Sequence, residues 1–187
     1  MQLLAVSGSL RRDSHNSRLL RAAAQQLPSG VELELYEGLK QIPPFDEDDE
    51  AAPAPEVVQW REAIEAADAV LFATPEYNSS IPGQLKNAVD WASRPKAQAA
   101  LRNKPVAVIG ASTSMFGALW SQAELRKVLA AAGARVLDNE LAVATAHEAF
   151  DGEDQLIEAE LGDALGNVVQ DLADAAQRRA QMTRVEA

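Results

Sequence analysis

A run of hydroxyl residues, one asparagine and two arginines follows a short apolar segment near the start of the chain. It reads Ser7-Gly8-Ser9-Leu10-Arg11-Arg12-Asp13-Ser14-His15-Asn16-Ser17 and leads into a helical pattern. A helix N-terminus offers unpaired N–H groups, and serine, asparagine and arginine side chains add neutral and cationic donors. Such a set of donors suits a phosphate group. The alternative is a polar turn in which Ser14 caps the helix and the arginines face solvent.

The charge of this run is opposite in sign to the charge of the whole chain. The 187 residues include 17 Lys and Arg and 28 Asp and Glu, which gives a net charge of −11. Between residues 7 and 28, four arginines stand against Asp13, a local balance of +3. The overall acidity argues against nucleic-acid binding, which requires a basic face. A phosphate therefore needs a site built locally, and this run is the place for it.

A second polar segment lies between two prolines further along the chain. It reads Thr74-Pro75-Glu76-Tyr77-Asn78-Ser79-Ser80-Ile81-Pro82-Gly83. Because Pro75 and Pro82 restrict the backbone, the N–H and C=O groups between them are held in fixed directions. Such a loop suits the edge of a heteroaromatic ring, and Tyr77 supplies an apolar face. The alternative is an ordinary strand-to-helix turn with Pro82 at the helix start and Tyr77 on the surface.

Side chains that carry acid–base, nucleophilic or metal chemistry are few. The chain has no cysteine, which excludes disulfides, thiol catalysis and cysteine-bound zinc. Its two histidines, His15 and His147, lack a triad-like arrangement of Ser or Asp, and no acidic cluster has metal-ligand spacing. The first loop also lacks the glycine patterns of dinucleotide and P-loop sites. We therefore expect no catalytic side chain and no metal, so that any redox chemistry comes from a bound cofactor.

Short apolar segments alternate with helical patterns along the chain. We expect strands at Gln2–Val6, Val31–Tyr36, Ala69–Ala73, Pro105–Ile109 and Ala134–Leu137, the last resuming at Leu141–Val143. Apolar residues recur at helical spacing within residues 16–27, 57–67, 85–92, 125–132 and 161–172. Continuous apolar strands are typical of a parallel sheet covered on both faces, so this order predicts one doubly wound α/β domain over residues 1–187. The tail after Arg178 is expected to fray.

In such a fold, ligands bind at the carboxyl ends of the strands, near the point where the strand order reverses. The loops after the first, third and fourth expected strands therefore matter most. The first two are the polar segments described above. The third covers Gly110–Gly117 and contains Ser112.

The first two loops together carry a recognisable pattern. G-S-x-R-x-x-S-x-N stands at Gly8–Asn16, and P-E-Y-N-x-S-x-P-G-x-L-K-N-A-x-D-W stands at Pro75–Trp91. These blocks resemble the NADPH-dependent FMN reductase family, which includes quinone, chromate and azo-dye reductases of flavodoxin-like fold. The resemblance extends over residues 2–175 in the order of elements. It implies a five-stranded parallel sheet of order 2-1-3-4-5 with helices on both faces, and FMN bound without a covalent link.

The resemblance also implies which residues bind the cofactor. Those expected around the FMN phosphate are Ser9, Arg11, Ser14, Asn16 and Ser17, those along the isoalloxazine ring are Pro75, Glu76, Tyr77 and Asn78, and Ser112 is expected at the ring or the ribityl chain. One departure stands in the third loop, where many relatives have adjacent glycines. Thr113, Ser114 and Met115 stand there instead and leave less room beside the ring.

The implied function is an FMN-dependent NAD(P)H oxidoreductase. NADPH or NADH reduces the bound FMN by hydride transfer and leaves, and a small-molecule acceptor then takes the electrons at the same face in a ping-pong order. Quinones, flavins, azo compounds and oxyanions such as chromate are the expected acceptors. Two alternatives are a flavodoxin-type electron carrier without NAD(P)H activity of its own and a non-flavin protein that binds a phosphate ligand on the same fold.

Two further expectations concern location and assembly. No signal peptide and no apolar run of roughly 20 residues is visible, so we expect a cytoplasmic protein that binds no membrane. The resemblance implies a homodimer or homotetramer, for which Trp91 and its helix would be natural interface material.

Overall fold

The expected apolar segments pair in parallel into one sheet in the computed structural model, which describes residues 1–186 and their side chains as far as Met182. The strands are β1 (Gln2–Ser7), β2 (Glu32–Leu35), β3 (Ala69–Thr74), β4 (Pro105–Ala111), β5 (Arg135–Val136) and β6 (Ala142–Val143). Their order is β2-β1-β3-β4-β5, and β6 also pairs with β4. The predicted α/β class and strand order are therefore confirmed.

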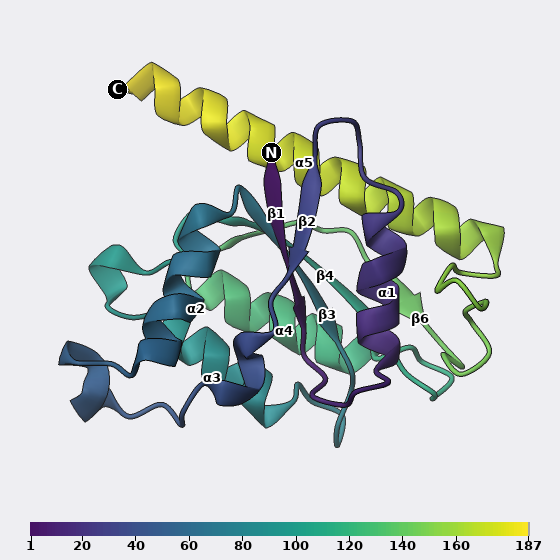
Figure 1. The fold of residues 1–187 in the computed structure, drawn as a ribbon, viewed down its shortest axis with the longest axis horizontal. Coiled ribbons are helices and arrows are strands. Elements are labelled where there is room, and N and C mark those ends of the chain that lie inside the picture. Colours follow the sequence, from purple (N-terminus) through teal and green to yellow (C-terminus); the bar gives the residue numbers. More distant parts are fainter. Residues whose placement is uncertain (187) are drawn as a thin grey trace.

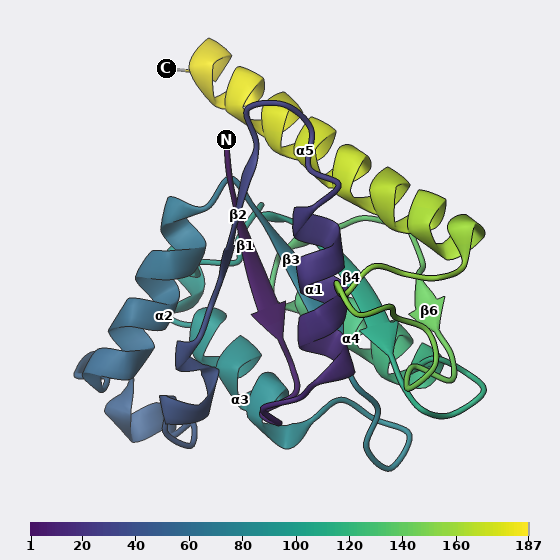
Figure 2. The ribbon, with the colours of Figure 1, turned by 45° about the vertical axis from the view of Figure 1, so that its right-hand side comes forward.

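Five α-helices are found among the described residues. They are α1 (His15–Ala24), α2 (Pro55–Ala66), α3 (Gly83–Ala92), α4 (Leu119–Ala131) and α5 (Ala159–Glu186), with short 3-10 turns at Gly38–Gln41, Glu47–Ala51 and Lys96–Gln98. The apolar residues of α2, α3 and α4 pack on one face of the sheet, and those of α1 and α5 on the other. Figures 1 and 2 show α2 and α3 on one side of β1 and α1 on the opposite side.

The last helix is longer than expected. α5 continues to Glu186, through the residues at which we expected the tail to fray. None of the helices in residues 1–186 combines the length and the apolar character that crossing a membrane requires.

The burial of each strand follows its sequence pattern. β1, β3 and β4 are apolar along their length and almost fully buried, because helices cover both of their faces. β2 alternates between exposed and half-buried residues because it lies at the edge of the sheet. The period-2 pattern of residues 31–36 is thus the pattern of an edge strand.

The fifth position of the sheet holds two short strands, in agreement with the expected segment at Ala134–Leu137 that resumes at Leu141–Val143. β5 pairs with the start of β4 and β6 with its end. Between them, Arg126 of α4 donates hydrogen bonds to the carbonyl oxygens of Val108 and Asn139. The guanidinium thus replaces a strand partner at Val108, and the backbone stays hydrogen-bonded across the break.

Two tryptophans are buried in the layer formed by α2 and α3. Trp60 is fully buried and donates from Nε1 to the Ala88 carbonyl oxygen at 2.7 Å. Trp91 is 1% exposed and donates to the Pro43 carbonyl oxygen at 2.9 Å. The expectation that Trp91 serves a subunit interface is therefore wrong for this protomer, because its ring packs in the core with its N–H already satisfied.

The sheet brings the three polar loops to one edge. β1, β3 and β4 are parallel neighbours, with Ser7 opposite Ala73 and Thr74 opposite Gly110. The loops that leave these strand ends therefore start side by side, as Figure 2 shows for the loops after β1 and β3. The point where the strand order reverses lies between β1 and β3, where a ligand is expected in this fold.

Candidate functional site

Ser14 ends the first loop and caps α1. Its Oγ accepts hydrogen bonds from the backbone N–H groups of Asn16 at 3.1 Å and Ser17 at 3.3 Å. Ser17 Oγ in turn donates to Ser7 Oγ at 3.0 Å. Ser14 is therefore the N-cap of the helix, as in the alternative interpretation of this loop as a polar turn. The cap fixes the position at which the loop enters α1.

Asn16 joins the first loop to the third. Its side chain is 2% exposed, its amide nitrogen donates to the Ala111 carbonyl oxygen at 2.9 Å, and its amide oxygen accepts from the Ala111 N–H at 3.0 Å. Both polar atoms of this side chain are therefore engaged with the end of β4. Asn16 lies at the predicted site, but the contact it makes is to the backbone of the neighbouring loop.

Glu76 joins the second loop to the third. Its Oε2 accepts from the backbone N–H groups of Trp120 at 3.1 Å and Ser121 at 3.2 Å, in the first turn of α4. The N-cap residue Ala118 supplies no side-chain hydrogen bond there. A carboxylate from another loop thus satisfies the helix N-terminus and its partial positive charge.

The second loop contains a tight turn. The backbones of Tyr77 and Ser80 exchange two hydrogen bonds, at 3.0 and 3.1 Å, and the two residues between them have left-handed φ angles of 53° and 59°. These angles are typical of a type I′ turn, which places Asn78 and Ser79 at the exposed tip. Tyr77 is 47% exposed beside the cleft.

The backbones of the first and third loops approach their neighbours closely. A Cβ atom at Gly8 would lie 2.7 Å from Leu85 Cδ2, and one at Gly117 would lie 2.6 Å from the Ala142 carbonyl carbon. Gly117 also has a φ of +54°, which side chains adopt rarely. Glycine is therefore required at Gly117, where a Cβ would meet backbone, whereas a Cβ at Gly8 would press mainly on the movable end of the Leu85 side chain.

Most of the predicted site residues border one small hollow. Its volume is about 110 Å³, and it is lined by Ser9, Arg11, Ser14, His15, Asn16, Pro75, Glu76, Tyr77, Ala111, Ser112 and Thr113. We call this hollow the cleft. Eight of the ten predicted residues line it, whereas Ser17 borders a neighbouring hollow of about 240 Å³ and Asn78 lies outside both.

Arg11 stands where three hollows meet. It borders the cleft, the neighbouring hollow beside Ser17 and a third hollow of about 340 Å³ lined also by Leu10 and Tyr77. Pockets for drug-sized ligands measure roughly 300–1,000 Å³. A ligand larger than the cleft can therefore extend from it past Arg11.

As far as the structure describes the chain, only two of the four arginines between residues 7 and 28 contribute unpaired positive charge to the first loop. Arg18 and Arg21 both bind Asp154, at 2.5 and 2.6 Å. Burial alone would raise the pKa of Asp154, but hydrogen bonds from Arg21 and Arg18 lower it overall. Among the described residues no carboxylate pairs with Arg11 or Arg12, so these two arginines supply the charge at the loop.

His15 is a cleft residue that the sequence did not assign. It lines the cleft, and its ring is parallel to the Phe150 ring, with 6.4 Å between centroids. Burial lowers the pKa of His15, and the nearby Arg11 and Arg18 lower it further. The position of His15 in the polar segment at residues 7–17 could have indicated that it lines the cleft. Its contact with Phe150 could not be predicted, because the two residues are far apart in the sequence.

The third loop exposes large apolar side chains beside the cleft. Met115 is 75% exposed, and Phe116 and Trp120 are each 48% exposed, with their rings edge to face at 4.8 Å. Of the residues that replace the glycines of many relatives, Thr113 lines the cleft and Met115 projects into solvent. Of these two side chains, only Thr113 can therefore reduce the space beside the flavin ring, as expected from the sequence.

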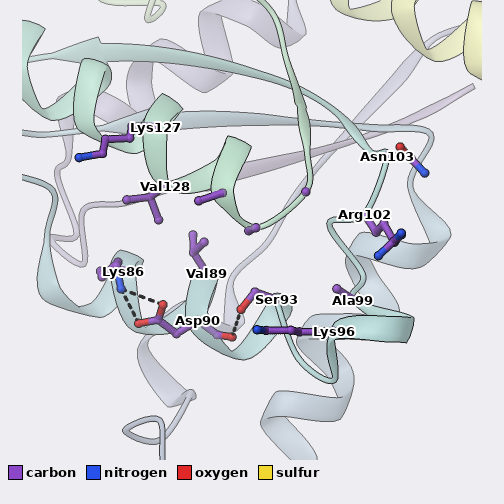
Figure 3. Close-up of a pocket in the computed structure, with 13 residues that line it drawn as sticks. Lys86, Val89, Asp90, Ser93, Lys96, Ala99, Arg102, Asn103, Lys127 and Val128 are labelled. Carbon is purple, nitrogen blue, oxygen red and sulfur yellow. Dashed lines mark hydrogen bonds and ion pairs between the residues drawn. The ribbon is translucent and has the colours of Figure 1, made fainter.

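A larger hollow lies elsewhere, between α3 and α4, and we call it the groove. It measures about 640 Å³ and is bordered by Lys86, Lys96, Arg102 and Lys127. Figure 3 shows the cationic ends of these side chains spread around the rim, far from one another. Lys86 is already bound to Asp90 at 2.7 Å. The groove has volume and charge, but its polar groups do not converge.

The structure is that of a flavodoxin-like α/β protein with a cleft at the carboxyl ends of β1, β3 and β4, the edge at which proteins of this fold bind their ligands. The chain belongs to the NADPH-dependent FMN reductase family, whose model matches residues 1–148. The resemblance seen in the two sequence blocks is therefore confirmed. Membership makes the protein an oxidoreductase of the class that uses FMN and a nicotinamide nucleotide.

Individual relatives agree with this assignment. The chain is 43% identical over 160 residues to an NAD(P)H-dependent FMN reductase of Pseudomonas aeruginosa, covering 84% of this chain and 85% of that protein. It is 42% identical over 125 residues to a quinone reductase of Pseudomonas putida, covering 66% and 67%. Among solved structures, the flavoenzyme FerB, an NAD(P)H:acceptor oxidoreductase of Paracoccus denitrificans, matches with a TM-score of 0.83 and 32% identity over 95% of this chain and 97% of FerB.

Proposed function

We propose that this chain passes electrons from NADPH or NADH through FMN bound in the cleft to a small quinone. The observation that carries the proposal is the convergence of three loops on the cleft, with the unpaired Arg11 at the border between it and two neighbouring hollows. Two relatives are named quinone reductase and 2-hydroxy-1,4-benzoquinone reductase, which supports quinones over azo compounds and oxyanions as acceptors, and a third, named FMN reductase, keeps free flavin as a second candidate.

The donor set of the cleft fits the phosphate of FMN. Arg11 offers a guanidinium free of any carboxylate, and Ser9 Oγ accepts from the Arg11 N–H at 3.4 Å, which holds the loop turned. A planar guanidinium beside hydroxyl groups is well suited to a phosphate monoester. We assign direct phosphate contacts to Ser9 and Arg11, with Ser17 as a further contact from the neighbouring hollow.

Two of the predicted contacts become positioning residues in this proposal. Ser14 caps α1, and Asn16 is paired with the Ala111 backbone, so both hold the loop that carries Arg11. Ser14 Oγ already accepts two backbone hydrogen bonds and Asn16 is held on both sides by Ala111, so only the Ser14 O–H and the second amide N–H of Asn16 remain for a ligand.

The second and third loops would hold the flavin ring. Pro75 and Tyr77 line the cleft from one side and Ser112 from the other, whereas Glu76 fixes the second loop on α4 and Asn78 stays at the turn tip. Bound FMN supplies the hydride chemistry. The chain's own residues bind and orient it, and none of the side chains in the cleft needs to act as a catalyst.

Assembly into a homodimer or homotetramer remains part of the proposal, with a different surface from the one first expected. Phe116 and Trp120 are exposed large aromatic residues at the rim of the cleft, and Met115 extends this patch. Exposed apolar patches of this kind commonly serve as contacts between subunits. Light scattering of the purified protein measures its mass, and a monomer that persists at high concentration would contradict this part.

The activity is tested by anaerobic mixing of the FMN-loaded protein with NADPH or with NADH while the flavin absorbance is followed. We expect the absorbance to bleach with at least one nicotinamide and to return when a benzoquinone is added. Because both substrates would use the same face, steady-state rates should give parallel double-reciprocal lines. A flavin that bleaches only with dithionite would favour the electron carrier, and a protein without FMN affinity in equilibrium dialysis would favour the non-flavin alternative.

A further inference from the structure

His15 is the one residue lining the cleft whose ordinary pKa lies near neutral pH. It is the first residue of α1, and its Nδ1 is buried without a hydrogen-bond partner among the described residues. The ring lies parallel to the ring of Phe150, with 6.4 Å between the ring centroids. A buried polar atom without a partner is rare in folded proteins and calls for an explanation.

Arginines near His15 disfavour its protonated form. Arg11 approaches from the first loop, Arg18 from the next turn of α1, and His147 from the segment before α5. The Arg18 guanidinium also lies 4.8 Å from the centre of the Phe150 ring. Asp154 pairs with Arg18, whereas Arg11 has no carboxylate partner in the described part of the chain.

The nearby carboxylates are already engaged. Asp154 binds Arg18 and Arg21, Glu148 lies 3.4 Å from His147, and Glu76 accepts from the N-terminus of α4. Asp13 lies on the exposed part of the loop. Burial first, and then Arg11 and Arg18, therefore lower the pKa of His15, so the imidazole is neutral at pH 7 in the free protein.

A phosphate in the cleft would reverse the sign of the local field. Opposite charge within a few ångströms favours the protonated imidazole, whereas the arginines alone oppose it. On the basis of the proposed function, we propose that His15 takes up a proton from solvent when the FMN phosphate binds and then serves as a second cationic contact beside Arg11. FMN binding is thereby coupled to pH, and affinity falls as pH rises above neutrality.

The chain allows this step to be observed at one residue. It has only two histidines, so the variant His147→Gln leaves His15 as the single imidazole. His147 is half exposed and does not line the cleft. NMR titration of the untagged variant should show His15 titrating at higher pH in the FMN complex than in the apoprotein, by about 1–3 pH units. An unchanged titration in the complex would overturn the proposal.

Calorimetry supplies an independent readout that needs no activity. FMN is titrated into the apoprotein at pH 7 in two buffers with different protonation enthalpies. Wild type and His147→Gln should take up as much as one proton per FMN, whereas His15→Gln should show no uptake and only whatever proton the phosphate itself releases on binding beside Arg11. Affinity of the wild type should fall by at most tenfold per pH unit above neutrality, the limit for one proton, and that of His15→Gln should stay nearly flat.

The outcomes separate this proposal from the one it rests on. Equal proton uptake by His15→Gln and wild type overturns the role of His15 and leaves FMN binding intact. If FMN binds to none of the three proteins (wild type, His147→Gln and His15→Gln), the cofactor site itself is overturned. Because the NMR titration is made on a protein that retains His15, a folding defect in His15→Gln does not affect that result.

Discussion

The cleft and the groove are both basic hollows on an acidic protein, and they differ in how their polar groups are held. The groove is several times larger and carries four cationic side chains, yet these are spread around its rim and Lys86 is bound by Asp90 (Figure 3). The cleft is small, but hydrogen bonds from buried or cross-loop side chains fix each of its three loops. Preorganised donors at the strand ends, and not volume, therefore indicate where the ligand binds.

The largest effect should come from the bond that joins the first and third loops. Asn16→Ala leaves the N–H and C=O of Ala111 buried without their partner, and each unsatisfied group costs about 1–3 kcal/mol. We expect the free energy of unfolding to fall by about 3 kcal/mol and FMN affinity to fall with it. Denaturant unfolding measures the first quantity. Asn167→Ala, at an exposed position on α5, is the control and should change little; equal losses in both variants would contradict the role of Asn16.

The second effect compares one cation from each hollow. Arg11→Ala removes the unpaired guanidinium of the cleft, and a hydrogen bond to a charged group contributes about 1.5–3 kcal/mol. We expect FMN affinity, measured by quenching of flavin fluorescence, to fall by roughly 10- to 100-fold with little change in stability. Lys127→Ala, on the rim of the groove, should leave the affinity unchanged. The comparison fails if Lys127→Ala weakens FMN binding as much as Arg11→Ala does.

The third effect tests a cation that belongs to neither hollow. Lys104 is 1% exposed, and its Nζ donates to the carbonyl oxygens of Ala67 and Glu65 at the end of α2. Burial lowers the pKa of Lys104 to about 8 from an ordinary value of 10.5. Between these values the unfolded chain binds more protons than the folded one, so stability should rise with pH.

Relative to Lys104→Met, the wild type should therefore gain at most about 2 kcal/mol of stability between pH 8 and pH 10. Denaturant unfolding of both proteins across this range measures the difference. A difference that is constant over the range, or that moves in the opposite direction, would show that burial does not control the charge of Lys104.

The smallest effect concerns the bond that joins the second loop to α4. Glu76→Gln keeps an oxygen that accepts from Trp120 and Ser121 but removes the negative charge at the helix N-terminus. We expect a loss of about 0.5–1 kcal/mol in the free energy of unfolding, from the helix dipole. Thermal unfolding detects the change. Glu62→Gln, at an exposed position on α2, should be neutral, and a larger loss there would contradict the assignment.

The sequence predicted the features that depend on local pattern. The apolar runs predicted β1, β3 and β4, and their order placed the three polar loops at one edge of the sheet. The sequence block from Pro75 to Trp91 predicted the family. These inferences succeeded because periodicity and motif are properties of neighbouring residues.

The pairings within the site depend on residues far apart in the chain, and the sequence did not predict them. Asn16 binds a backbone group 95 residues away, and Glu76 binds α4 44 and 45 residues away. Arg18 and Arg21 were counted toward the phosphate loop, yet Asp154 binds both. The ring of Trp91, expected at an interface, found its partner in Pro43. Each of these residue types can serve several roles, and in each case a tertiary contact determines which role the residue has.

Hydrogen–deuterium exchange of the protein with and without FMN tests most directly where the cofactor binds. The account predicts slower exchange in the loops after β1, β3 and β4, at residues 8–17, 75–80 and 111–116, with residues 86–103 and 127–133 around the groove unchanged. Protection confined to the groove, with no change in the three loops, would contradict it.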